Sequence, residues 1–212
     1  LKIYRKNLRV NPINFNNKKN NTSESKFIYM SLNLEGNPLT LPETQKLIYD
    51  NVLPQNQKLD NIYEVSNYKN AVDEMNKLFR KKLTLDIILN YHKLAMAQKN
   101  HAGQFRKENV IIKKNPNFKT EDWKFIQNKI NNLMEKYNLF ESSKKDAFEI
   151  IKFASFFHNE FQRIHPFLDG NSRISRLLMM HILLYHQIPF YDLPIGYFDL
   201  YLDFTKRSLK RD

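Results

Sequence analysis

Residues 165–176 read His-Pro-Phe-Leu-Asp-Gly-Asn-Ser-Arg-Ile-Ser-Arg, and this run decides how the rest of the chain is interpreted. Apolar side chains recur at helical spacing before it, from Ala147 to Ile164, and after it, from Leu177 to Leu184. That periodicity predicts two core helices. The polar run is therefore expected to form a loop between them and to open the second helix.

The loop gathers groups that suit the transfer of a phosphate-containing group. A helix N-terminus offers backbone N–H groups and a positive dipole end to an anion. Arg173 and Arg176 are three residues apart, so they share one face of that helix. Asp169 supplies a hard oxygen ligand for Mg²⁺. His165 carries an imidazole whose ordinary pKa, about 6.5, suits proton transfer near neutral pH.

Each of these features also has an ordinary explanation. A His-Pro pair often only ends a helix, and an Asp-Gly pair is usually a turn. Paired arginines on a helix are usually solvated. The order and spacing of all of them between two apolar helices favour a functional site.

The run resembles the signature of Fic-domain proteins, His-Pro-Phe-x-Asp/Glu-Gly-Asn-Gly/Lys-x-x-x-Arg. It departs from that signature at Ser172, where serine still keeps the backbone N–H of the phosphate-binding turn. The resemblance implies an all-α, Fic-type helical domain with a small β-hairpin flap. It also implies an enzyme, a protein adenylyltransferase that moves AMP from ATP, with Mg²⁺, to a Ser, Thr or Tyr hydroxyl of a target protein.

The same resemblance assigns roles to residues. His165 would act as the catalytic base and Asp169 would hold the metal. The nucleotide phosphates would be bound by the turn and by the two arginines of the signature, that is, by Gly170, Asn171, Ser172, Arg173 and Arg176. Self-modification is a common property of this family and is expected here.

A second stretch, Ser31-Leu32-Asn33-Leu34-Glu35-Gly36, resembles the inhibitory-helix pattern Ser/Thr-x-x-x-Glu-Gly/Asn of Fic proteins. The resemblance implies that Glu35 pairs with Arg176 and obstructs the γ-phosphate of ATP. Ser31 and Glu35 would place the chain in the subgroup with an N-terminal inhibitory helix. The alternative is an ordinary helix end, with Gly36 just beyond it.

A third stretch, residues 103–116, resembles the flap of Fic domains. Val110, Ile111 and Ile112 would form a strand whose exposed edge holds a target segment by strand addition. The alternative is a surface hairpin that has no partner.

Composition limits the remaining choices. The chain of 212 residues suits one domain with a substantial core, and a hydrophobic content of 42% excludes general disorder. No apolar run approaches the roughly 20 residues needed to cross a bilayer. The absence of cysteine excludes disulfides and thiolate chemistry. No signal-peptide pattern opens the sequence, and a cytoplasmic location is expected.

The formal net charge is +12, and much of it lies near the two ends. Basic ends could bind nucleic acid. The sequence shows no helix-turn-helix or zinc-binding pattern that would recognise a nucleic-acid sequence, so we do not expect this function. Three alternatives stay open: a Fic relative that transfers another phosphate-containing group, one that removes AMP, and a non-catalytic basic binding module. A homo-oligomer is equally compatible with the sequence.

The expected organisation is one domain over residues 1–212, with an irregular basic segment over 1–21, an inhibitory helix over 22–36 and a Fic core over 37–200. Helices are predicted over 40–52, 60–81, 84–99 and 120–137, on both sides of the signature, and from about 196. Glu64, Asn67 and Tyr68 are interpreted as structural or pocket-lining. His158 is interpreted as a hydrogen-bonded core residue, and His92 has no evident partner.

Overall fold

The computed structural model describes residues 18–112, 115, 117–188, 201 and 203. In this part of the chain the regular structure is helical, and no β-strand is formed, so the predicted all-α class is confirmed. The elements are α2 (Lys18–Asn33), α3 (Leu41–Asp50), α4 (Leu59–Leu78), α5 (Leu85–Ala95), the 3-10 helix η1 (Trp123–Phe125), α6 (Ile126–Glu141), α7 (Ala147–Ile164) and α8 (Asn171–Tyr185).

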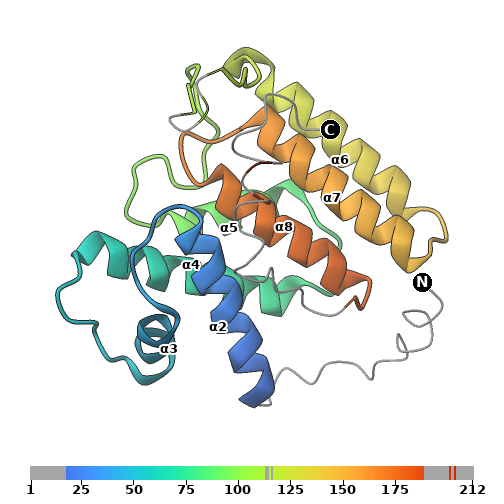
Figure 1. The fold of residues 1–212 in the computed structure, drawn as a ribbon. Coiled ribbons are helices and arrows are strands. Elements are labelled where there is room, and N and C mark those ends of the chain that lie inside the picture. The colour runs from blue at the N-terminus through green and yellow to red at the C-terminus, as the bar shows by residue number, and fades with distance from the viewer. Residues whose placement is uncertain (1–17, 113–114, 116, 189–200, 202, 204–212) are drawn as a thin grey trace.

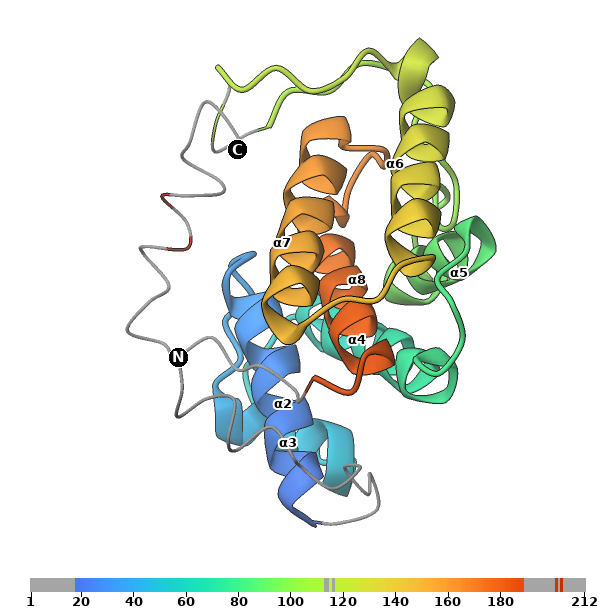
Figure 2. The same ribbon diagram turned by 90° about the vertical axis from the view of Figure 1, so that its right-hand side faces the viewer.

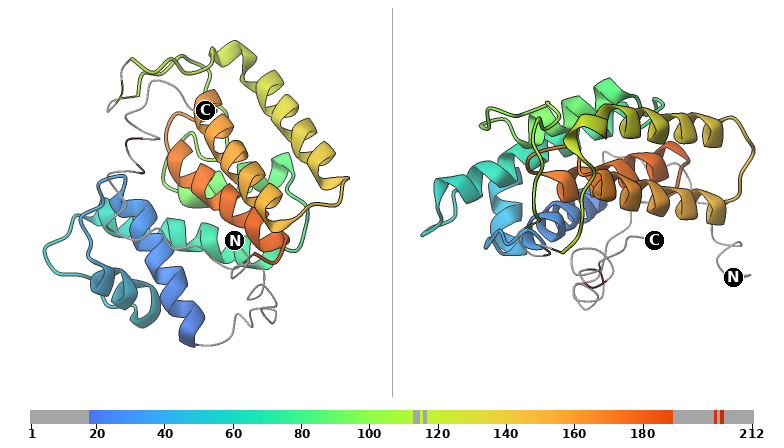
Figure 3. Two further views of the ribbon diagram at one scale, coloured as in Figure 1. Left: turned by 45° about the vertical axis from the view of Figure 1, so that its right-hand side comes forward. Right: turned by 90° about the horizontal axis from the view of Figure 1, so that it is seen from above.

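Helix α8 lies at the centre of the molecule (Figure 1). It packs mainly against α7, and it also contacts α5, α4 and α2. Figure 1 shows α6 on the side of α7 that faces away from α8, and Figure 2 shows the same helices from another side. Figure 3 shows α2 and α3 on the opposite side of α8. Most side chains of α8 are buried, as expected for a helix surrounded by others. The polar N-terminus of this helix is therefore brought into the middle of the fold.

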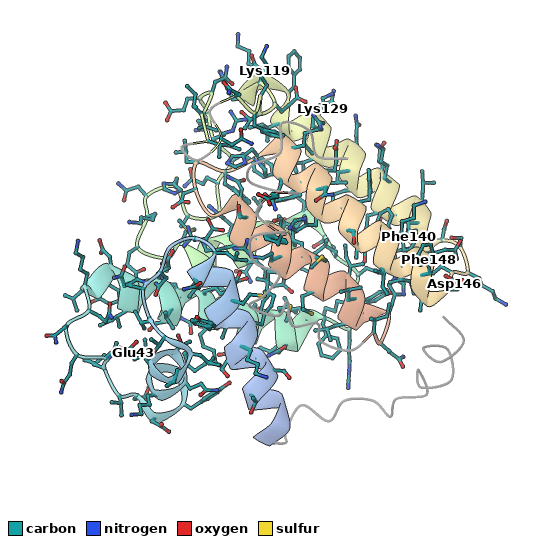
Figure 4. All side chains as sticks on the ribbon, in the orientation of Figure 1. Glu43, Lys119, Lys129, Phe140, Asp146 and Phe148 are labelled. Atoms are coloured by element: carbon teal, nitrogen blue, oxygen red, sulfur yellow. The ribbon has the colours of Figure 1, made fainter. Side chains whose placement is uncertain are left out.

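Local capping explains where several helices begin. Thr40 and Glu43 form a capping box at the start of α3, as predicted, and Asp146 and Glu149 form another at the start of α7. Figure 4 labels Glu43 and Asp146 at these two helix starts. Thr84 caps α5, because its hydroxyl accepts a hydrogen bond from the Ile87 N–H.

Several predicted helix boundaries are wrong, including the ends of α4, at Leu78 rather than residue 81, and of α6, at Glu141 rather than residue 137. Helix α2 begins at Lys18 rather than near residue 22, since the residues in between include no Gly or Pro to stop it. Helix α5 ends at Ala95, earlier than residue 99. Thr120 does not cap a helix, because its hydroxyl donates to the Val110 carbonyl, and Asp122 caps η1 ahead of α6 instead.

The predicted β-hairpin flap is not formed as strands in the described part of residues 103–116. Val110, Ile111 and Ile112 are irregular. The Val110 carbonyl accepts from the Thr120 side chain, and the Ile112 carbonyl accepts from the Asn115 N–H in a tight turn. These acceptors are therefore used outside a strand ladder, and the segment keeps a loop conformation.

None of the helices that the structure describes is long and apolar enough to cross a membrane. The helix expected from about residue 196 and the irregular segment expected over 1–21 lie largely outside the described residues. Of the former, Tyr201 and Asp203 are described, and both are helical.

Candidate active site

The polar run forms the loop between α7 and α8, as the sequence predicted. His165 ends α7 in the left-handed conformation, with φ 53°, and Gly170 starts α8 with φ 78°. A side chain at position 170 would also meet the Met96 sulfur at about 3.0 Å, so glycine suits both the backbone and the packing there. The loop therefore reverses the chain tightly between two buried helices.

The imidazole of His165 is oriented by the last turn of α7. Its Nδ1 lies 3.3 Å from the Gln162 carbonyl oxygen, which can only accept a hydrogen bond. This contact assigns a proton to Nδ1, so Nε2 is the nitrogen that would accept a proton from a substrate. This is the tautomer that a general base requires.

The Asn171 side chain hydrogen-bonds to the backbone of the loop that precedes it. Its side-chain oxygen accepts from the Phe167 N–H at 2.9 Å, and its nitrogen donates to the Phe167 carbonyl at 2.8 Å. Asn171 is buried, so both ends of the amide are committed to the loop. These contacts shape the turn, and the role of Asn171 in orienting the phosphates stays a prediction.

His92 of α5 packs against the loop. The sequence analysis did not predict this supporting role. Its ring stacks on Phe167 with centroids 3.6 Å apart and planes within 4° of parallel. The Gly103 N–H donates to Nδ1 at 2.8 Å, so Nε2 carries the proton and donates to the Asp169 carbonyl at 3.1 Å. Burial lowers the pKa of His92 to about 4, which keeps it neutral.

Arg106 holds the loop from the segment that was expected to form the flap. Its Nε donates to the His165 carbonyl at 2.8 Å, and its backbone N–H donates to the Pro166 carbonyl at 2.9 Å. The side chain is buried at 3% exposure. The segment after Gly103 therefore fixes the backbone at His165.

Asp169 faces solvent at the mouth of the site, with 59% of its side chain exposed. One oxygen accepts from the Gly170 N–H at 2.6 Å and from Arg173 Nη2 at 3.1 Å. Partial burial raises the pKa of Asp169, but the charge of Arg173 and the Gly170 hydrogen bond outweigh it and hold the pKa below its ordinary value. The carboxylate is therefore ionised at neutral pH.

Arg173 is buried and also pairs with Glu64 of α4. The other oxygen of Glu64 accepts from Asn37 Nδ2 at 2.8 Å. The interpretation of Glu64 as a structural or pocket-lining residue is confirmed. Arg173 is thus held between two carboxylates at the first turn of α8.

Arg176 is held by contacts from α2, from the turn that follows α2 and from Tyr201. Its Nε donates to the Ser31 hydroxyl at 2.8 Å and its Nη2 donates to the Ser31 carbonyl at 2.7 Å. Nη2 also pairs with Glu35 Oε1 at 2.8 Å, and Nη1 lies 3.4 Å from the Tyr201 hydroxyl. The predicted pairing of Glu35 with Arg176 is therefore present in the structure.

A cleft of about 190 Å³ opens between α4, the end of α5 and the start of α8. Its lining includes Asp60, Glu64, Asn67, Lys99, Asp169 and Arg173. The first-turn N–H groups of α8, at Asn171, Ser172 and Arg173, have no acceptor within the helix, since the first helical bond is Ile174 to Gly170. The cleft thus brings carboxylates and cations beside the first turn of α8.

Among the described residues, no three His, Cys, Asp or Glu side chains are grouped to bind a metal by themselves. Mg²⁺ in phosphate-transfer sites usually needs only one or two carboxylates, because waters and substrate phosphates complete its shell. The exposed, ionised carboxylate of Asp169 fits that arrangement. Val110, Ile111 and Ile112 belong to a different segment and do not line this cleft.

Residues 82–183 match the model of the Fic/DOC family. This part of the chain is a Fic/DOC-family domain. Curated relatives include the protein adenylyltransferase Fic of Drosophila grimshawi, 25% identical over 189 residues, and that of Aedes aegypti, 26% identical over 162 residues. These alignments cover 87% and 74% of this chain but only 38% and 31% of the relatives. The chain therefore spans about a third of their length.

Solved structures give the same fold. A Fic domain containing signaling protein from Bacteroides thetaiotaomicron superimposes with a TM-score of 0.84 at 22% identity, covering 99% of this chain and 83% of that one. A Fic family protein from Desulfovibrio desulfuricans superimposes with a TM-score of 0.75 at 22% identity, covering 89% and 57%. This Fic chain thus keeps the helical fold of its family across low identity.

Proposed function

We propose that this Fic protein is a protein adenylyltransferase that transfers AMP from ATP to a Ser, Thr or Tyr hydroxyl of a target protein. The observation that carries the proposal is the grouping of His165, Asp169 and the two signature arginines around the N-terminus of α8. Membership of the Fic/DOC family and the adenylyltransferase names of its relatives support it.

The reaction needs a base placed beside an anion-binding helix end. His165 Nε2 takes the proton of the target hydroxyl, and the hydroxyl oxygen then bonds to the α-phosphorus of ATP. The bond from that phosphorus to the bridging oxygen breaks, and pyrophosphate leaves. The products are an AMP ester on the target, pyrophosphate and a protonated His165.

The protein supplies mainly position and charge. The backbone N–H groups of residues 171–173 bind phosphate oxygens, and the arginines balance the negative charge of the phosphate chain. Asp169 would hold Mg²⁺, which supplies a further positive charge to the phosphates when bound. Arg176 would receive the γ-phosphate once Glu35 no longer occupies it.

Glu35 would restrain this reaction in the state described by the structure. Its carboxylate pairs with the guanidinium that the γ-phosphate needs, and it would repel that phosphate. Ser31, one turn earlier on α2, holds the same guanidinium through two more contacts. Movement of α2 would release both residues together.

Mass spectrometry of the purified chain after incubation with Mg²⁺ and ATP tests the reaction. Addition of one AMP mass to the chain, or to a cellular protein, is the expected result. ATP labelled at the α- or the γ-phosphate distinguishes the alternatives, since only AMP transfer carries the α-label, and transfer of the γ-label alone would contradict the proposal. A cytoplasmic location and the oligomeric state stay predictions.

A further inference from the structure

The contacts of Arg176 come from two parts of the chain. Two of its four hydrogen-bond contacts are made to Ser31 of α2, and a third is made to Glu35 in the turn that follows this helix. The fourth links Nη1 to the Tyr201 hydroxyl, far from α2 in the sequence. A movement of α2 that carries Glu35 away from the guanidinium would also withdraw Ser31, because the two residues are only four positions apart.

The Tyr201 hydroxyl is itself oriented by α7. His158 Nε2 lies 3.0 Å from that hydroxyl and 2.9 Å from Gln162 Nε2. His158 Nδ1 lies 3.0 Å from the Asn159 side-chain oxygen, which can only accept, so the ring proton is on Nδ1. His158 Nε2 is then the acceptor, and the Gln162 amide N–H and the Tyr201 hydroxyl both donate to it.

A directed chain of hydrogen bonds follows from this tautomer. Arg176 Nη1 donates to the Tyr201 oxygen, the Tyr201 hydroxyl donates to His158 Nε2, and His158 Nδ1 donates to Asn159. His158 is buried at 4% exposure, so its end of the chain is fixed in the core. The interpretation of His158 as a hydrogen-bonded core residue is confirmed, and the structure adds its connection to the site.

We propose that Tyr201, oriented by His158, is a positioning residue that keeps the Arg176 guanidinium aligned for the γ-phosphate after α2 has given up its contacts. Its oxygen meets Nη1, whereas Glu35 and the incoming phosphate share Nη2. Tyr201 can therefore stay in place during the exchange. Its role rests on the proposed function, since a nucleotide must bind at Arg176 for it to matter.

The affinities for nucleotides with and without a γ-phosphate distinguish this role from a merely structural one. The test compares Kd values for ATP and for ADP, measured by calorimetry with Mg²⁺ on the full 212-residue chain. Glu35→Gly is the reference, and Tyr201→Phe is added to it. Loss of a hydrogen bond to a charged group should weaken ATP binding about tenfold. ADP binding should change little, because ADP lacks the phosphate that Arg176 receives.

Tyr91→Phe in the same background is the matched control. Tyr91 donates to His181 Nδ1 at 2.8 Å, so it forms a similar Tyr–His pair that does not contact Arg176. The Tyr91→Phe substitution should leave the ratio of the Kd values for ATP and ADP unchanged. His158→Leu removes the other end of the hydrogen-bond chain that runs from Arg176 through Tyr201. It should reproduce the selective loss of ATP affinity.

Equal weakening of ATP and ADP, or no weakening of either, would overturn the role of Tyr201. Folding of each variant is checked by thermal unfolding, and His158→Leu decides the matter if Tyr201→Phe does not fold. Failure of Glu35→Gly itself to bind ATP would contradict the proposed function as well. The two failures are therefore distinguishable.

Discussion

Glu35 and Arg176 are separated by 141 positions in the sequence, yet Glu35 Oε1 lies 2.8 Å from Arg176 Nη2. The arginine is buried, with 2% of its side chain exposed, whereas 21% of the glutamate side chain is exposed. A buried guanidinium needs an anionic or polar partner. Its anionic partner in this structure is the Glu35 carboxylate, in the turn just after α2, and its partner during the proposed reaction would be a phosphate.

Replacing the base should stop the chemistry and leave the fold intact. His165→Ala removes a half-buried loop side chain, so thermal unfolding should change little. AMP transfer should fall about 10²- to 10⁴-fold, the usual contribution of a general base. His186→Ala, which removes a histidine paired with Glu141 at the other end of α8, is the control and should keep its activity. A near-wild-type rate for His165→Ala would remove this residue from the mechanism.

Replacing the metal ligand should change the Mg²⁺ dependence. Asp169→Ala is expected to raise the Mg²⁺ concentration required for half-maximal transfer, with a much smaller effect on stability, because the side chain is mostly exposed. Asp73→Ala, an acidic partner of Lys69 on α4, is the control. An unchanged Mg²⁺ titration would assign the metal to other residues.

Asn171 should matter for stability as well as for activity. Asn171→Ala leaves the buried N–H and carbonyl of Phe167 without their partners, which should lower the free energy of unfolding by about 1–3 kcal/mol. Urea unfolding measures this loss. Asn131→Ala, which removes an exposed amide on α6, should cost far less. Equal losses of unfolding free energy in the two variants would argue against a stabilising role of Asn171 in the loop.

The neutral state of His92 predicts a pH dependence of stability. Its pKa is about 4 in the folded protein and about 6.5 in the unfolded chain, so the unfolded chain binds the proton first as the pH falls. The contribution of neutral His92 to the free energy of unfolding is complete above pH 6.5, and it is lost as the pH falls from 6.5 to about 4. Between pH 7 and 5 this amounts to about 2 kcal/mol.

The measurement is urea unfolding of wild type and His92→Gln at both pH values. The variant should be less stable than wild type at pH 7 but should lose less stability on going to pH 5. His181, whose pKa burial also lowers, adds its own pH dependence to both proteins and cancels in the comparison. An identical loss in wild type and variant would show that His92 is not the group that titrates.

Much of the site could be predicted from the sequence because its residues are contiguous. The order of polar groups in residues 165–176 predicted the loop, the start of α8 and the positions of both arginines. The pairing of Glu35 with Arg176 followed from a family resemblance and not from spacing, since no local pattern joins residues so far apart.

The sequence missed residues whose partners are backbone atoms brought from elsewhere. His92 donates to a carbonyl 77 positions away, and Arg106 donates to one 59 positions away. Nothing local marks such a contact. The flap was predicted from the resemblance of residues 103–116 to that of Fic domains. Strand formation depends on a partner strand, and the Val110 carbonyl accepts from the Thr120 hydroxyl instead.

Transfer of α-labelled AMP by Glu35→Gly tests the central claim most directly. The substitution removes the carboxylate that occupies Arg176, so transfer, including self-modification, should rise well above wild type. A gain from a single substitution is informative, because most substitutions only damage a protein. Adding Arg176→Ala should abolish the gain, since the freed guanidinium is then missing. A folded Glu35→Gly variant that transfers AMP no faster than wild type would contradict the inhibitory role of Glu35.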